Sequence, residues 1–147
     1  MSSYGLVHLI HLLCGIGFIG VVFFELVILE GMRKPLGPAR MAEVEFALIN
    51  RARRIMPWVV GTLFVSGIVL AVFHRAALAQ MLTSSFGTLL ALKILLATSV
   101  LCHFVYALKT AVDGCMNSRK FKYLHFSVAT HMLLIVFLAK GMFYIHW

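Results

Sequence analysis

Four long apolar runs occupy most of this chain and restrict what it can fold into. They cover approximately residues 4–29, 55–73, 86–108 and 123–145, and about 20 mostly apolar residues are enough for a helix to cross a bilayer. The 147 residues are 62% hydrophobic and 12% charged, whereas a soluble domain would be roughly half apolar. Backbone polar groups inside a bilayer must be satisfied within the protein, which favours helices. The sequence therefore predicts an all-α integral membrane protein, with four transmembrane helices bundled into a single domain over residues 1–147.

The basic residues that give the chain its net charge of +8 are concentrated in two connections. Between the first and second runs, and between the third and fourth, lie Arg33, Lys34, Arg40, Arg51, Arg53, Arg54, Lys109, Arg119, Lys120 and Lys122. The remaining connection holds only Arg75. Basic connections face the cytoplasm as a rule, so we expect both termini on the periplasmic side of a bacterial inner membrane. This placement points to membrane lipid as the partner of the positive charge, and nucleic acid is not expected.

The first connection contains a helix-breaking stretch, Lys34–Pro38, followed by an amphipathic segment at residues 39–54. Met41, Val44 and Leu48 share its apolar side, and arginines flank it. Such a helix lies at the headgroup level of a membrane, so we expect a short amphipathic cytoplasmic helix between the first two spans. An extension of the second span is the alternative.

Ionisable side chains inside a bilayer are costly and mark functional sites. With the termini outside, His8 and His11 lie roughly 6 and 10 Å below the outer end of the first helix, at about 1.5 Å per residue. The outer half also receives His74, Lys93, Lys140 and His146. A second polar layer on the inner side consists of Glu25, His103, His125 and His131. For His74, His125 and His146 an interfacial role is the ordinary explanation.

The pair His8 and His11, three residues apart, points to one sector of the first helix, and Gly15 extends that sector one turn deeper. An imidazole nitrogen beside a glycine suits a flat iron-containing ligand, so one b-type haem held by a first-helix histidine and a ligand from another helix fits this pattern. Two stacked haems are disfavoured, because the first helix has no inner histidine. Copper is the rival cofactor, since imidazole and thioether groups also suit it.

Several segments carry a resemblance to a known group. These are His8-Leu-Ile-His11, the stretch NRARRIMPWVVGTLFVSG before and within the second span, the third span LLALKILLATSVLCHFVYALK, and the histidine-bearing last span. Together they resemble the HemJ and CopD group of small four-helix membrane proteins. HemJ proteins are haem b-containing protoporphyrinogen oxidases, and CopD proteins are linked to copper uptake or resistance. The resemblance implies functional roles for His11 and Lys93, with His103 at the position of the third-helix histidine.

These observations predict an inner-membrane protein that binds haem b and performs or relays electron transfer, as a HemJ-like oxidation of a porphyrinogen-type substrate would require. With the resemblance, His11 is the expected axial ligand of the haem, and Lys93 or His8 is the expected second ligand. The cofactor-binding candidates are His11, Lys93, His8, Lys140 and His103. A quinone or another membrane electron carrier is the expected redox partner, and the inner histidines are expected to move protons. We also expect a homo-oligomer, because a chain this short encloses little space. The alternatives are a CopD-like copper-binding or transport protein and a structural subunit of a membrane complex.

Overall fold

The computed structural model describes residues 2–112 and 118–145, and its regular elements are helices. They are α1 (Ser3–Phe23), the π-helix η1 (Phe24–Leu29), α2 (Arg33–Phe73), α3 (Arg75–Ala79), α4 (Ser85–Val112) and α5 (Ser118–Gly141). Four helical segments are long and apolar enough to cross a membrane: Ser3–Leu29, Arg33–Phe73, Ser85–Val112 and Lys122–Gly141. The expected all-helical chain with four such segments is confirmed.

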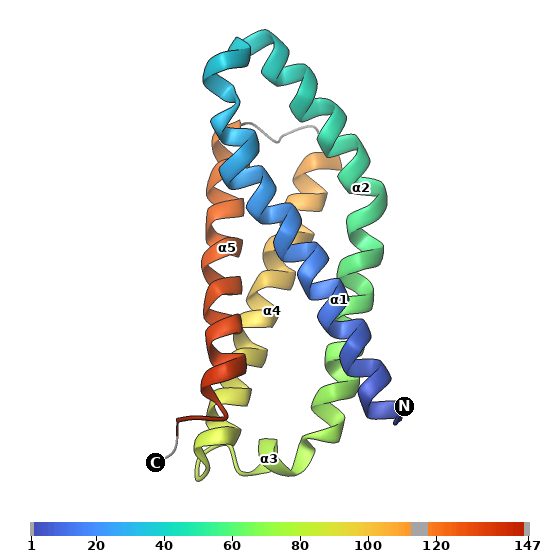
Figure 1. The fold of residues 1–147 in the computed structure, drawn as a ribbon, viewed down its shortest axis with the longest axis vertical. Coiled ribbons are helices and arrows are strands. Elements are labelled where there is room, and N and C mark those ends of the chain that lie inside the picture. The colour runs from blue at the N-terminus through green and yellow to red at the C-terminus, as the bar shows by residue number, and fades with distance from the viewer. Residues whose placement is uncertain (1, 113–117, 146–147) are drawn as a thin grey trace.

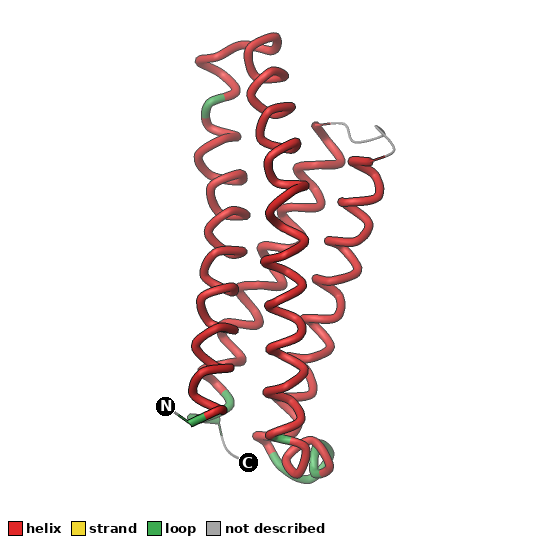
Figure 2. Tube along the Cα trace, turned by 90° about the vertical axis from the view of Figure 1, so that its right-hand side faces the viewer, coloured by secondary structure: helices red, strands yellow, loops and turns green. Residues whose placement is uncertain are grey.

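The long helices form an antiparallel bundle, with α1 running obliquely across it (Figure 1). The start of α1, the short helix α3 and the end of α5 lie at one end of the bundle (Figures 1 and 2), which we call the terminal end. The opposite end carries η1, the first part of α2 and the end of α4. Most of the chain's lysines and arginines lie there, and we call it the basic end.

Packing divides the bundle into two hairpins, because α1 packs mainly on α2 and α4 packs mainly on α5, while α1 and η1 also contact α5. One apolar core joins all four long helices through Phe18, Val22, Val60, Val100, Val128 and Met132. A second core at the terminal end holds α4 and α5 together through Leu89, Leu90, Leu138 and Met142, with α3 against it. The two hairpins are therefore united in the middle of the bundle, and the terminal end has a core of its own.

Large apolar side chains cover the outside of the bundle. Leu13, Ile16, Val65 and Leu133 are each more than half exposed, at 58%, 60%, 64% and 72%. A water-soluble protein rarely leaves apolar surface in so continuous a layer. Lipid contact accounts for it, and the chain is a multi-pass membrane protein by length and composition of its helices.

Residues 39–54 are the first part of α2, and the structure shows no separate amphipathic helix there. The chain turns at Gly37, whose φ of 72° and ψ of 169° are readily reached only without a side chain. From Pro38 the helix continues into the second apolar run, with Met41 buried and Phe46 70% exposed. The observed helix therefore corresponds to the alternative of an extended second span.

The last helix ends earlier than the sequence suggests, at Gly141 instead of residue 145. Lys140 consequently lies in the final turn of α5 and is exposed. His146 lies outside the described residues.

Candidate functional site

His11 in α1 is directed at α2. Its Nδ1 lies 3.0 Å from the carbonyl oxygen of Leu63 and 3.1 Å from Oγ of Ser66. A carbonyl oxygen can only accept, so these partners assign the proton to Nδ1 and leave Nε2 with a lone pair. The buried Ser66 hydroxyl donates onward to the Thr62 carbonyl at 2.7 Å. Metal-binding histidines commonly have this arrangement, with the second ring nitrogen anchored to a carbonyl.

The imidazole of His11 packs closely against Gly67. A Cβ atom built on Gly67 would lie 3.1 Å from Cε1 of His11, which is tighter than an ordinary van der Waals contact. The glycine therefore makes room for the ring. Ser66 and Gly67 were not identified as site residues from the sequence, because only the mutual rotation of α1 and α2 brings them to His11.

Lys93 occupies the same half of the bundle, in α4, and is half-buried. Within residues 2–112 and 118–145, Lys93 has no hydrogen bond or ion pair. The acidic residues of the chain are Glu25, Glu30, Glu43, Glu45 and Asp113, and the described ones all lie at the basic end. The half of the bundle next to the terminal end, which we call the terminal half, therefore holds cationic side chains. None of the described carboxylates lies in it.

The other histidines of the terminal half have aromatic neighbours. His8 is exposed, with its ring centroid 5.8 Å from that of Tyr4. His74 stacks between Tyr4 and Phe86, at centroid distances of 5.9 and 6.0 Å. Its stacking joins α1 to α4, which gives His74 a packing role at the terminal end.

His103 does not join the terminal cluster. It lies ten positions after Lys93 on α4, about 15 Å along the helix axis, and both of its ring nitrogens are hydrogen-bonded. Nδ1 is 2.7 Å from the Ser99 carbonyl on the same helix, and Nε2 is 3.1 Å from Oγ of Ser127 on α5. His131 on α5 repeats this pattern. Its Nδ1 is 2.7 Å from the Ser127 carbonyl, and its Nε2 is 3.2 Å from Oγ of Ser99.

These four residues, Ser99, His103, Ser127 and His131, form a closed ring that we call the Ser–His clamp. Each histidine donates from Nδ1 to the serine carbonyl of its own helix, and each serine hydroxyl donates to Nε2 across the helix pair. The imidazole centroids are 5.4 Å apart. The sequence signal is a repeated Ser-Val-x-x-His, at residues 99–103 and 127–131. The spacing alone does not reveal it, because the reciprocity depends on antiparallel register.

A second polar group lies nearer the basic end, at η1. Glu25, only 6% exposed, lies in this π-helix, and its Oε2 is 2.6 Å from Nε2 of His125 on α5. The distance is that of an ion pair, yet Oε2 meets no hydrogen-bond donor in suitable geometry among the described residues. π-helical turns in membrane and soluble proteins are frequently found at functional sites. Here the π-helix contains the buried carboxylate.

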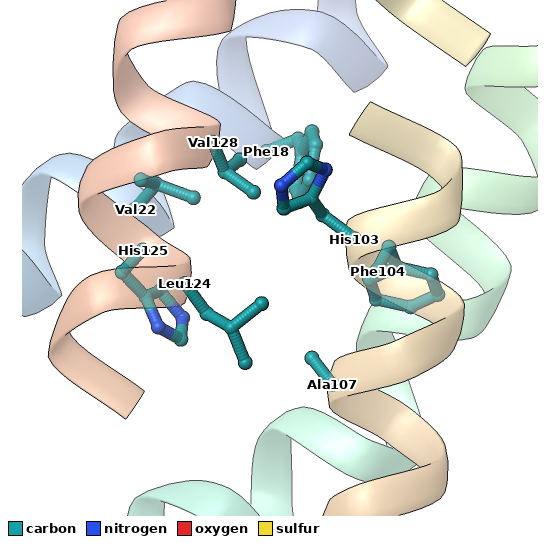
Figure 3. A pocket seen from close by; sticks show the side chains of 8 residues that line it. All are labelled: Phe18, Val22, His103, Phe104, Ala107, Leu124, His125 and Val128. Atoms are coloured by element: carbon teal, nitrogen blue, oxygen red, sulfur yellow. The ribbon is translucent and has the colours of Figure 1, made fainter. Parts of the chain in front are cut away.

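Two cavities adjoin the Glu25–His125 pair. The larger, of about 100 Å³, has Glu25, Arg53, Pro57 and His125 in its wall, with contributions from all four long helices. The smaller, of about 40 Å³, is lined by His125 and His103 together with apolar side chains. Figure 3 shows His103 and Phe104 reaching this smaller cavity from α4, and Leu124, His125 and Val128 from α5. The cavities therefore place the Glu25–His125 pair beside the Ser–His clamp.

Among the described side chains, no group of three or more His, Cys, Asp or Glu residues is positioned to hold a metal ion. His11 presents one imidazole nitrogen that is not anchored to α2, and Lys93 is a half-buried cation.

Comparison of the chain with protein-family models, with curated proteins and with solved structures finds no match. The resemblance to the HemJ and CopD group accordingly stays a prediction from the sequence.

Proposed function

We propose that this chain is an inner-membrane, HemJ/CopD-like protein that binds a b-type haem in its terminal half and has a redox role. In this proposal the basic end faces the cytoplasm and both termini face the periplasm. The arginine-rich first part of α2 meets anionic lipid headgroups. A quinone or similar membrane carrier exchanges electrons with the protein, which assembles as a homo-oligomer.

The observation that carries the proposal is the anchoring of His11. Its Nδ1 is held at 3.0 Å from the Leu63 carbonyl, so Nε2 keeps the lone pair that binds iron. His11 is the axial ligand in our proposal, and Lys93 either provides the second ligand or pairs with a haem propionate. His8 and Lys140 are the next candidates for these secondary roles. Bound haem would supply the one-electron chemistry, while the protein supplies orientation and charge.

The charge of the terminal half favours haem over the copper alternative. Lys93 and Lys140 lie there, whereas every described carboxylate lies between residues 25 and 45. A propionate-bearing ligand would neutralise these lysines, while a copper ion would add positive charge where none of the described carboxylates compensates it. Copper handling is therefore the second candidate, and a purely structural subunit is the third.

The test is the absorption spectrum of the full chain purified in mild detergent from a haem-replete host, oxidised and then reduced with dithionite. We expect a Soret band with reducible α and β bands in the wild type, and their loss in His11→Ala. His74→Phe is the matched control, because it removes an imidazole from the same half and keeps the ring stacking with Tyr4 and Phe86. Its spectrum should equal the wild type's.

A second variant perturbs His11 without removing it. Gly67→Ala places a methyl group 3.1 Å from Cε1 of His11, so it should displace the ring and shift the Soret band. Gly61→Ala, at a position with nothing within 4 Å, should leave the band in place. A colourless wild type after haem supplementation would refute the proposal. Stoichiometric copper in that colourless protein would then support the copper-handling candidate. A protein that retains neither haem nor copper would support the structural-subunit candidate.

A further inference from the structure

The buried carboxylate of Glu25 has no part in the proposed haem site, which lies in the other half of the bundle. A carboxyl group this deeply buried is costly unless its charge is compensated or it binds a proton. The compensating group is the His125 imidazole, 2.6 Å away, and together the two groups can hold one proton in more than one arrangement. Oε2 of Glu25 receives no hydrogen bond from the described residues, and Glu25 lines the larger cavity.

The volume of the larger cavity indicates what it can hold. At about 100 Å³, it is smaller than an engineered apolar cavity of roughly 150 Å³ that binds benzene. One water molecule needs about 10–15 Å³ of such space and two to four polar partners. Most of the wall is apolar, and Glu25, Arg53 and His125 are its polar side chains, so water fits beside these three groups.

A backbone group adds a further hydrogen-bond acceptor. Pro57 has no N–H, so it cannot bond the carbonyl of Arg53 four residues earlier in α2. Both residues are in the wall of the larger cavity. A water molecule there can satisfy the Arg53 carbonyl, as ordered water does for other buried polar groups.

The smaller cavity links this hydrated region to the Ser–His clamp. Its volume of about 40 Å³ has room for about three water molecules at about 10–15 Å³ each. His125 and His103 both line it. Beyond His103 the clamp leads further from the basic end, to Ser99 and His131.

We propose that Glu25, His125, the water of these two cavities and His103 form a proton-transfer path that runs from the basic end to the middle of the membrane. The charged and titratable groups facing the path are Glu25 from η1, Arg53 from α2, His103 from α4, and His125 and His131 from α5. The inference does not require haem. If the proposed haem is present, the path supplies protons to the redox reaction from the side opposite the haem.

The transfer involves no electrons and one proton. An O–H bond of protonated Glu25, or an N–H bond of protonated His125, breaks, and a water molecule passes a proton onward. Before the transfer, the lone pair of His103 Nε2 accepts a hydrogen bond from the Ser127 hydroxyl. When the proton arrives, a new N–H bond forms at Nε2, and the Ser127 hydroxyl rotates so that its oxygen accepts a hydrogen bond from it. Nδ1 keeps its bond to the Ser99 carbonyl, so the clamp can take up a proton without losing its anchor.

The test is hydrogen exchange at the His103 imidazole, measured by NMR on ¹⁵N-histidine-labelled full chain in lipid nanodiscs without haem. Glu25→Gln removes the proton-binding carboxylate. Ala107→Leu fills space at a residue that lines both cavities. Each should slow exchange by about tenfold or more, which corresponds to about 1.4 kcal/mol in activation free energy.

Two controls match these substitutions. Glu43→Gln changes an exposed carboxylate of α2, and Val105→Leu enlarges a side chain on the exposed side of α4, where Val105 is 55% accessible. In both control variants the His103 imidazole should exchange hydrogen at the wild-type rate. Unchanged ¹⁵N shifts of His131 confirm that each variant is folded. Wild-type exchange in folded Glu25→Gln or in folded Ala107→Leu would overturn the path. Because haem is absent, neither result depends on whether His11 binds it.

Discussion

Removing a serine hydroxyl of the Ser–His clamp should weaken the attachment of α4 to α5 and lower the free energy of unfolding. Ser99 and Ser127 each donate one bond across the helix pair, at 3.2 and 3.1 Å, and each bond satisfies a histidine Nε2. Interhelical hydrogen bonds in membranes average about 0.6 kcal/mol and reach about 1.7 kcal/mol. The histidine acceptor left unpaired adds to the loss. We therefore expect Ser99→Ala and Ser127→Ala to lower the free energy of unfolding by about 1–2 kcal/mol each.

The neighbouring threonines provide matched controls for this experiment. Thr98 and Thr130 are exposed, and their hydroxyls bond only their own helices, to the carbonyls of Ile94 and Phe126 at 2.9 and 3.0 Å. Replacing either by alanine should change the free energy of unfolding by less than about 0.5 kcal/mol. Reversible unfolding in mixed micelles measures all four variants under the same conditions. Serine variants as stable as the threonine variants would refute the assignment of the clamp as an interhelical bond network.

An alanine substitution should lower the stability of the protein at Gly87 and raise it at Gly17. Acid should weaken the ion pair of Glu30 and Lys122 at the basic end. A Cβ on Gly87 would meet the Ala77 carbonyl oxygen too closely for the backbone to remain in place, so Gly87→Ala should destabilise by about 1–3 kcal/mol. Gly17 has nothing within 4 Å, and Gly17→Ala should stabilise by up to about 1 kcal/mol; equal unfolding temperatures would contradict this. The hydrogen bond from Lys122 lowers the pKa of Glu30, so its stabilisation is complete above the unfolded pKa of about 4.3 and is lost as the pH falls through the lower folded value. Lys122→Ala should accordingly show a smaller loss of stability on acidification, and identical pH profiles would argue against the pair.

The sequence predicts the helices well because transmembrane length and apolarity are local properties. It also places His11 and Lys93 in the same half of the bundle, since depth follows from 1.5 Å of rise per residue. What it does not provide is the rotation of each helix about its axis. The contact of His11 with Ser66 depends on such rotations and on packing between distant segments.

The polar layer near the basic end is the clearest example of this difference. The sequence groups Glu25, His103, His125 and His131 by depth, and the structure divides them into an ion pair and a hydrogen-bonded ring. The π-helix containing Glu25 inserts a change of register that apolar periodicity cannot reveal. Likewise, the chain turns at Gly37, as the Lys34–Pro38 stretch indicates, but the helix that follows runs on through Pro57 into the second apolar run, which the sequence left open.

The division into hairpins α1–α2 and α4–α5 has a consequence for how the chain is made. Each hairpin joins long helices that follow one another along the chain, so neither hairpin needs the other in order to pack its own two helices together. The first hairpin can assemble while the second is still being synthesised. The later union of the two is then a docking of preformed units through Phe18, Val60, Val100 and Val128, and biogenesis depends on that small apolar surface.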